Sequence, residues 1–244
     1  VLTDEGRLLY DHVSEAFEAL NEGEEKLKRS IELGVGQLKI GVSSTLCKYM
    51  LLPYLKEFIH RNPHISISIE CQSTNETLKL LDDDKIDIGL IGKPASLKTF
   101  NFYYLDNIED IFVTTKDYLR NLSARGVKKS EILQNSTLML LDKGNMTRKY
   151  IDDYLQENQI HVKDSIDISN MDLLIDFAKI GVGVACVIKS IVSKELADGT
   201  LIEIPLGIPI HKREVGFAYK ESSKLSTSLQ TFIKFYESYT PEDF

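Results

Sequence analysis

The sequence predicts an α/β protein preceded by a long amphipathic helix. Three features of the 244-residue chain support this prediction. Up to Gly34, apolar residues recur at helical spacings, and no proline occurs before Pro53. After Gly36 the spacing changes to the alternation of a strand, and strand-like and helix-like segments then follow one another to the C-terminus. That order is typical of parallel sheets.

The opening helix has a marked start and an apolar stripe. Thr3 can cap it, and Asp4 and Glu5 lie in the first turn, where the helix dipole favours negative charge. A helix of roughly 30 residues is about 45 Å long, more than a small domain covers. We therefore expect most of the stripe to pair with a second copy as a coiled coil, and the glycines after the helix favour an extended arm. The alternative is a helix that lies on its own domain. The stripe consists of Leu9, Val13, Ala16, Leu20, Leu27 and Ile31, with Gly23 at one missing position.

The rest of the chain yields strands and helices in turn. Leu38, Ile40 and Val42 form the first predicted strand, and a helix follows to about Arg61. The further predicted strands span 65–70, 86–91, 110–115, 137–141, 165–169, 181–188, 201–205 and 213–220. The further predicted helices span 73–84, 148–158, 171–180 and 225–239, the last with Leu225, Leu229, Phe232, Ile233 and Tyr236 on one face.

Composition argues against a nucleic-acid-binding surface, a membrane span and a cysteine framework in this chain. The net charge of −8 and the pI near 5.2 provide no basic surface for a nucleic-acid backbone. No apolar run is long enough to span a membrane, and no secretion signal is evident, so we expect a soluble, cytoplasmic protein. Cys47, Cys71 and Cys186 lie far apart without a C-x-x-C pair, which indicates idle thiols rather than a disulfide framework or a zinc site.

No catalytic pattern is evident. His60 and His64 are four residues apart, but Pro63 ends the helix between them, so they do not form a helical metal pair. The other three histidines have no evident partners. We expect neither enzymatic activity, nor a catalytic residue, nor a metal, nor a cofactor.

Several motifs in order resemble one family. "LT.EG..L" leads into the long helix and is followed by "G.LKIGVSST....LP.L..F....P.I.I.I", "L..DKIDIGLI", "GN.TRKYID.YL" and "L..FAKIGVGVACV". Together they resemble the LysR-type transcriptional regulators over essentially the whole chain. The resemblance implies two Rossmann-like subdomains, as in type II periplasmic binding proteins, after a linker helix. It also implies that a DNA-binding winged helix-turn-helix precedes this chain, so that DNA is bound there and not by this part.

The same resemblance implies domain boundaries and partners. Residues 1–35 would contain the end of the DNA-binding wing and the dimerisation helix, and residues 36–244 the effector-binding domain. Within it, subdomain I would span about 36–105 and 221–244, and subdomain II about 106–220. The chain would cross between them near Tyr103 to Asn107 and near Tyr219 to Glu221. The implied partners are a small-molecule effector in the cleft and further copies of the chain, as a dimer or tetramer.

Candidate effector ligands lie at predicted helix starts. Ser43, Ser44 and Thr45 directly precede a helix, so their hydroxyls and the first backbone N–H groups can face an anion. Ser73 and Thr74 repeat this arrangement, although a capping box with Glu76 already explains Ser73. Plain capping is the alternative role for all of these residues.

The resemblance extends the site to the opposite wall of the cleft. It places Asn145, Met146 and Thr147 there, with Asn170 at a further helix start and Ile188 at the edge of the pocket. The family usually has a proline near Ile188, which this sequence lacks, and Lys189 could supply a positive charge. A solute-binding protein of a transport system, with the same fold, is the alternative function.

Overall fold

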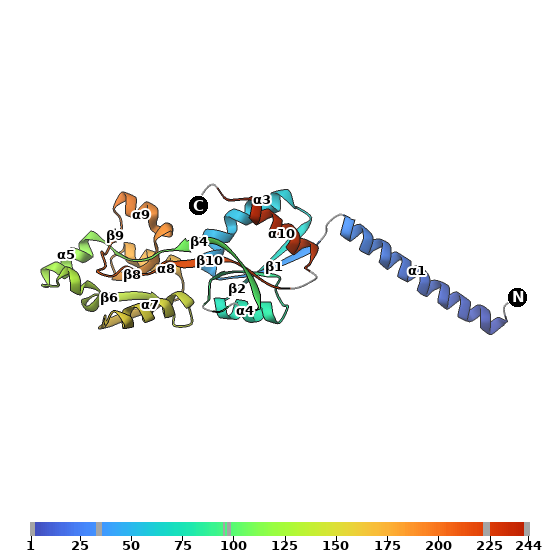
Figure 1. Cartoon of the computed structure of the whole chain (residues 1–244), viewed down its shortest axis with the longest axis horizontal. Helices are drawn as coiled ribbons and strands as arrows, with labels where there is room; N and C mark the ends of the chain where they lie inside the picture. Colours follow the sequence, from blue (N-terminus) through green and yellow to red (C-terminus); the bar gives the residue numbers. More distant parts are fainter. Residues whose placement is uncertain (1–2, 33–35, 95, 97–98, 222–224, 242–244) are drawn as a thin grey trace. The chain divides into compact units, whose positions relative to one another are not determined.

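The computed structural model describes the chain except residues 1–2, 33–35, 95, 97–98, 222–224 and 242–244 (Figure 1). It contains two five-stranded sheets, each with helices attached. The chain divides into two compact units. The first consists of Val1–Leu38, Tyr54–Ser68 and Ser223–Phe244, and the second of Lys39–Pro53 and Ile69–Ser222.

Helix α1 (Asp4–Glu32) confirms the predicted opening helix. The Thr3 hydroxyl accepts a hydrogen bond from the Gly6 N–H at 3.1 Å, so Thr3 caps the helix as expected. Its 29 residues correspond to a length of about 43 Å. Leu9 and Leu20 of the stripe are 65% and 69% exposed, and Val13 and Ala16 are also exposed. The side chains of Leu27 and Ile31 lie outside the described residues.

The first sheet has the order β2-β1-β3-β10-β4. Leu38, Ile40 and Val42 are fully buried, as their alternation predicts. The prediction of parallel sheets is only partly right. β1 and β3 are parallel, but β10 runs antiparallel to both β3 and β4, because the chain returns to this sheet in the opposite direction. The strands are β1 (Gly36–Val42), β2 (Ile65–Cys71), β3 (Ile88–Gly92), β4 (Phe100–Ile108) and β10 (Arg213–Lys220).

The helix after β1 is interrupted by a π-helical turn. It consists of α2 (Ser44–Leu46), the π-turn η1 (Cys47–Leu51) and α3 (Leu52–Arg61). Pro53 explains the change, since it has no N–H to donate and is tolerated only in the first turn of a helical segment. Helix α3 begins one residue before Pro53, which therefore lies in its first turn.

An aromatic cluster forms the core of the first unit. Phe58 of α3 contacts Phe232 and Phe235 of α10 (Thr227–Ser238), with ring centroids 4.9 and 5.3 Å apart. Phe232 and Tyr236 are buried, as the predicted face of α10 requires. Ile233 is only half-buried, and Phe235 takes a place in the core instead.

Helix α4 (Thr74–Asp82) lies unusually close to the first sheet. A side chain at Gly41 would place its Cβ 2.8 Å from the Thr77 Cγ2 atom, and one at Gly89 would place it 2.7 Å away. Both glycines are therefore needed for the close approach of the helix. The first turn of α4, which contains Thr77, thereby lies against β1 and β3.

The second sheet has the order β7-β6-β8-β5-β9 and lies entirely in the second unit. β6 is parallel to β7 and β8, whereas β5 is antiparallel to β8 and β9. Each of the five strands of this sheet lies within or overlaps a predicted strand. Helices α5, α6 and α9 were not predicted. The elements are β5 (Asp110–Thr114), β6 (Thr137–Leu141), β7 (Asp164–Ile168), β8 (Val184–Ile188), β9 (Ile202–Glu203), α5 (Lys116–Ala124), α6 (Ile132–Asn135), α7 (Met146–Glu157), α8 (Met171–Lys179) and α9 (Ser193–Asp198), with short 3₁₀ helices η2 (Lys129–Glu131) and η3 (Lys189–Val192).

Candidate functional site

A pocket of about 630 Å³ lies within the second unit. It is formed where β1, β3, β6 and β8 end and where α2, α4, α7 and α8 begin. Ligands of open α/β sheets bind at such carboxyl ends, and pockets of this volume hold small organic molecules. Its lining consists of Ser43, Thr45, Leu46, Ser73, Thr74, Gly92, Lys93, Pro94, Ile108, Leu141, Asn145, Met146, Thr147, Tyr150, Met171, Ile188, Lys212, Arg213 and Glu214.

Each of the four helix starts has a polar cap. The Ser43 and Ser73 hydroxyls accept hydrogen bonds at 3.3 Å from the N–H groups of Leu46 and Glu76. The Asn145 and Asn170 side-chain oxygens accept from the N–H groups of Thr147, at 2.8 Å, and Leu173, at 3.0 Å. These caps fix the first turns, whose positive dipole ends favour an anion. The expected capping roles of Ser73 and Asn170 are confirmed.

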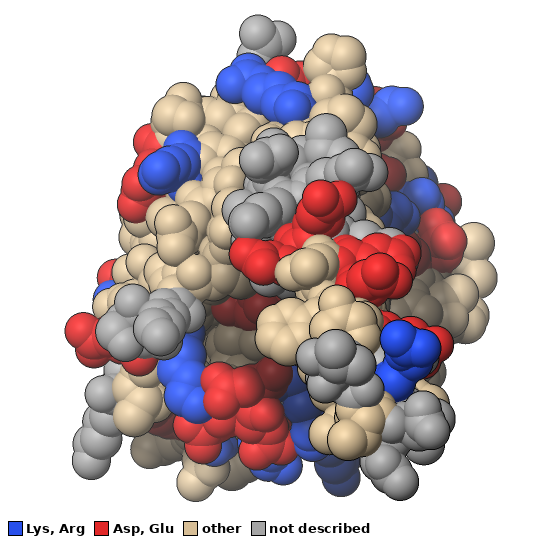
Figure 2. Space-filling model, turned by 90° about the vertical axis from the view of Figure 1, so that its right-hand side faces the viewer, with Lys and Arg blue, Asp and Glu red and all other residues tan. Residues whose placement is uncertain are grey.

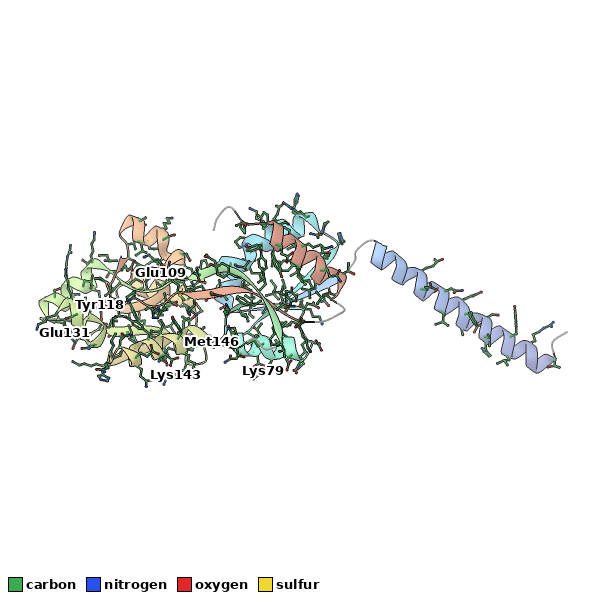
Figure 3. The ribbon with its side chains drawn as sticks, in the orientation of Figure 1. Lys79, Glu109, Tyr118, Glu131, Lys143 and Met146 are labelled. Carbon is green, nitrogen blue, oxygen red and sulfur yellow. The ribbon has the colours of Figure 1, made fainter. Side chains whose placement is uncertain are left out.

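The structure gathers most of the predicted site residues around this one pocket. Ser44 does not line it, because it is exposed at the first position of α2. Asn170 does not line it either, and its neighbour Met171 takes that place. Lys189 is held away from the lining by ion pairs of 3.1 Å with Glu109 and Glu203. The predicted residues that line the pocket are Ser43, Thr45, Thr74, Asn145, Met146 (labelled in Figure 3), Thr147 and Ile188.

A buried ion pair supports one wall of the pocket. The Arg213 guanidinium donates from Nε to Asp110 Oδ2 at 2.9 Å and from one terminal nitrogen to Oδ1 at 3.0 Å. That nitrogen also donates to the Thr147 hydroxyl at 3.3 Å, and the guanidinium stacks 5.1 Å from the centre of the Tyr150 ring. Burial raises the pKa of Asp110 above its ordinary value, although Arg213 opposes this effect. The pair thus fixes Thr147, Tyr150 and Arg213 in one arrangement.

The remaining charges of the pocket are paired at its edge. Lys93 pairs with Glu214, and Lys212 pairs at 3.0 Å with Glu109, which is labelled in Figure 3. Hydrogen bonds from Lys212 and then Lys189 lower the pKa of Glu109, which therefore stays ionised. The second terminal nitrogen of Arg213 has no partner among the described residues. Arg213 thus contributes a charged group to the lining that the Asp110 pair does not fully occupy.

A polar bridge outside the lining connects two of the helix starts. Asp172, in the first turn of α8, accepts hydrogen bonds from Lys48 at 2.7 Å and from the Tyr49 hydroxyl at 2.5 Å. These two bonds lower the pKa of Asp172. The Lys48 and Asp172 side chains are about half exposed, at 52% and 49%. The bridge joins η1, which follows the first sheet's β1, to α8 of the second sheet.

Sequence reasoning missed several lining residues. Arg213 was read as the first residue of a strand, and no short-range signal indicated that Asp110, far away in the chain, would pair with it. Lys93 and Pro94 come two and three residues after the end of a predicted buried strand, and ligands of α/β sheets bind near such strand ends, so both could have been identified. Tyr150 lies one helical turn after Met146 and could have been inferred from helical spacing.

The described residues show neither a metal-binding cluster nor a membrane-spanning helix. No three His, Cys, Asp or Glu side chains among them are grouped for a metal ion. None of the described helices is long and apolar enough to cross a bilayer. On the face shown in Figure 2, acidic and basic side chains are interspersed rather than gathered into a basic patch.

Comparison with known proteins identifies the family. Residues 32–240 match the LysR substrate binding domain. The chain belongs to this family, and it is part of a LysR-type transcriptional regulator. It is 23% identical over 236 residues to the HTH-type transcriptional regulator YeiE of Escherichia coli, covering 96% of this chain and 78% of that protein.

Solved LysR regulatory domains have the same fold. The CcmR regulatory domain of Synechocystis, in complex with 2-PG, superposes with a TM-score of 0.69 at 19% identity, over 82% of this chain and 95% of that one. The effector-binding domain of QuiR, in complex with shikimate, gives a TM-score of 0.65 at 16% identity, over 82% and 94%. The expected fold, two α/β sheets like those of type II periplasmic binding proteins, is thereby confirmed.

Proposed function

We propose that this chain is the effector-sensing and oligomerisation part of its regulator, and that a small anionic effector binds the pocket of the second unit. One observation carries the proposal. Four capped helix starts and the Arg213 guanidinium meet around a single concave space. Helix N-termini and a guanidinium both favour negative charge, and the apolar side chains of the lining supply area for an organic ligand.

Two related structures support a small-molecule ligand for this fold. CcmR was solved with 2-PG and QuiR with shikimate. A transport function for the same fold is disfavoured, because the relatives of this chain are transcriptional regulators. The proposal assigns the pocket a binding role without catalysis, and places its action in the cytoplasm, where a bacterial regulator meets DNA.

We further propose that α1 joins two copies of the chain. Its stripe is exposed along the described part of the helix, with Leu9 65%, Val13 44% and Leu20 69% exposed. Apolar residues at a and d spacing are typical of a coiled-coil seam. Effector binding would then change the relation between copies, by a coupling of about 1–3 kcal/mol, and the DNA-binding part of the regulator would respond to that change. We keep the predicted domain boundaries as part of this proposal: residues 1–35 contain the dimerisation helix, and residues 36–244 form the effector-binding domain with its two subdomains.

The first experiment identifies a ligand. A thermal-shift panel of organic acids, amino acids and inorganic anions is run on the chain. A ligand present at about 100 times its dissociation constant should add about 2.7 kcal/mol to the free energy of unfolding. If no anion in the panel raises the melting temperature while a neutral or cationic compound does, the anionic assignment is wrong.

The second experiment locates the ligand. Thr45→Val and Thr147→Val each remove one lining hydroxyl while keeping the shape of the side chain, and each should weaken the confirmed ligand by about 0.5–1.5 kcal/mol. Ser44→Ala is the matched control, because Ser44 is adjacent in sequence but exposed and outside the lining. Equal effects of Ser44→Ala and Thr45→Val on the dissociation constant would contradict the proposed site.

A further inference from the structure

Two cysteines that are far apart in the sequence meet beside the pocket. Cys71 ends β2, and Cys47 begins η1. The Cys47 thiol lies close enough to Cys71 for that neighbour to raise its pKa. The backbone brings the two residues together. The Gln72 N–H donates to the Val42 carbonyl at 2.9 Å, which holds the end of β2 against the end of β1. The Cys47 N–H donates to the Ser43 carbonyl at 2.8 Å. The expectation of three idle thiols did not foresee this pair.

The two thiols differ in exposure, so an oxidant in solution reaches one of them more readily. Cys71 is exposed, whereas Cys47 is half-buried. Burial, and then the neighbouring Cys71, raise the pKa of the Cys47 thiol, which therefore stays protonated and is the poorer first nucleophile. Cys186 is buried in β8, and burial raises its pKa well above the ordinary value, so it provides an unreactive internal control.

We propose that Cys47 and Cys71 form a reversible disulfide when the protein meets a hydroperoxide. The Cys71 thiolate attacks the outer oxygen of the hydroperoxide, the O–O bond breaks, and an alcohol or water leaves. Cys71 is then a sulfenic acid, oxidised by two electrons. The Cys47 sulfur attacks that sulfur, the S–O bond breaks, and the hydroxide leaves as water with the Cys47 proton. The sum is two thiols and one hydroperoxide to one disulfide, one alcohol and one water. A dithiol then reduces the protein disulfide to two thiols and is itself oxidised to a disulfide.

The disulfide would act on the effector pocket through the neighbours of both cysteines. Leu46 precedes Cys47, and Ser73 follows Cys71 by two residues; both line the pocket. A disulfide bond is only about 2.05 Å long, so the two sulfurs of the free thiols must approach each other for the bond to form. The start of η1 and the end of β2 would shift together and displace the caps of α2 and α4. This consequence rests on the proposed function, whereas the disulfide itself does not.

The first test counts thiols. The full chain is treated with hydrogen peroxide, denatured, alkylated and analysed by mass spectrometry. Alkylated cysteines should fall from three to one, with peptides linked through Cys47 and Cys71, and dithiothreitol should restore all three. Cys71→Ser, a change at an exposed position, should leave Cys47 and Cys186 alkylated after the same treatment. Three remaining thiols in the wild type, or a link to Cys186 or to another molecule, would overturn the proposal.

The second test separates the disulfide from its consequence. Oxidation should change amide hydrogen exchange at Leu46 and Glu76, whose N–H groups are bonded to the caps Ser43 and Ser73. The N–H groups of Thr147 and Leu173, bonded to Asn145 and Asn170, provide the matched controls. A disulfide without any change at Leu46 or Glu76 would overturn the link to the pocket. Neither result depends on whether an anion binds there.

Discussion

The stripe of α1 and the pocket of the second unit are both open surfaces, but they differ in chemistry. The stripe is a row of exposed apolar side chains at spacings of three and four along a single helix. The pocket is concave, and its polar groups are fixed by caps and by a buried ion pair. An extended apolar row suits another protein surface, whereas a concave site with a few fixed donors suits a small ligand. The two surfaces should therefore respond to different substitutions and take different partners.

The buried ion pair makes the pocket wall part of the folded structure. Arg213→Met should cost about 3–5 kcal/mol of unfolding free energy, because it leaves the buried Asp110 carboxylate without a partner. Urea denaturation measures this loss. Lys212→Met, which removes an exposed cation next in sequence, is the matched control and should cost much less. Equal losses would mean that the buried Arg213–Asp110 pair stabilises the fold no more than the exposed pair of Lys212.

The pH dependence of the same variant has a definite sign. Burial raises the pKa of folded Asp110 above its unfolded value, so the folded state binds that proton more tightly, and stability falls as pH rises between the two values. Without Arg213, which opposes the shift, this window widens. The deficit of Arg213→Met should therefore be larger at about pH 8 than at about pH 5. A deficit that grows toward acid pH would contradict this assignment.

The stripe should respond through association. Val13→Asp combined with Leu20→Asp should dissociate the chain in sedimentation velocity, because burying each such side chain contributes about 1.5–3 kcal/mol. Ser14→Asp combined with Asn21→Asp adds the same charge outside the stripe and should leave the mass unchanged. If both double variants sediment like the wild type, α1 is not the interface.

Substitution of Gly23 should increase the stability of α1 and the association of its stripe. It lies inside α1, and a Cβ built at this position would meet nothing within 4 Å. Gly23→Ala should stabilise the helix by about 0.5–1 kcal/mol, since glycine loses more backbone entropy than alanine. Gly23→Leu should also fill the missing position of the stripe. We expect tighter association for the leucine variant than for the alanine variant, measured by dilution in analytical ultracentrifugation; no difference between them would place Gly23 outside the seam.

The polar bridge beside the pocket should give the smallest effect. Asp172→Asn should cost about 0.2–1 kcal/mol at neutral pH, because the Lys48–Asp172 pair is half exposed. The lowered pKa of Asp172 means that this stability is present above the ordinary carboxyl pKa and is lost as pH falls through the lowered value. Denaturation at about pH 7 and about pH 3 measures the difference. Asp176→Asn, on the same helix, is the control; a difference between wild type and Asp172→Asn that persists in acid would be inconsistent with the bridge.

The sequence predicted helices and strands correctly where a segment had both a regular apolar spacing and a recognisable start or end. The alternation of Leu38, Ile40 and Val42, the capping box at Ser73 and the segment 213–220 all correspond to observed elements. β4 was read as a crossing rather than a strand, because its nine residues lack a regular apolar alternation, with Tyr104 46% exposed. β4 is a strand because it pairs with β10, and this long-range pairing cannot be read from the local sequence of β4.

The candidate site shows the same limit. Helix starts such as Thr45, Thr74 and Thr147 were accessible from sequence, because capping chemistry is local. Arg213 and Asp110 were not, since they are 103 residues apart and each reads as an ordinary strand residue. Cys47 and Cys71 were missed for a related reason, because only the alignment of β1 with β2 brings them together.

The most direct test of the central claim measures ligand affinity in three proteins by isothermal titration: the wild type, the Thr45→Val and Thr147→Val double variant, and the Val13→Asp and Leu20→Asp double variant. The ligand is the anion that gives the largest thermal shift. The pocket variant should lose about tenfold or more in affinity, equal to about 1.4 kcal/mol, while the stripe variant should change it by no more than the coupling between copies. A pocket variant that binds the anion as tightly as the wild type would contradict the account.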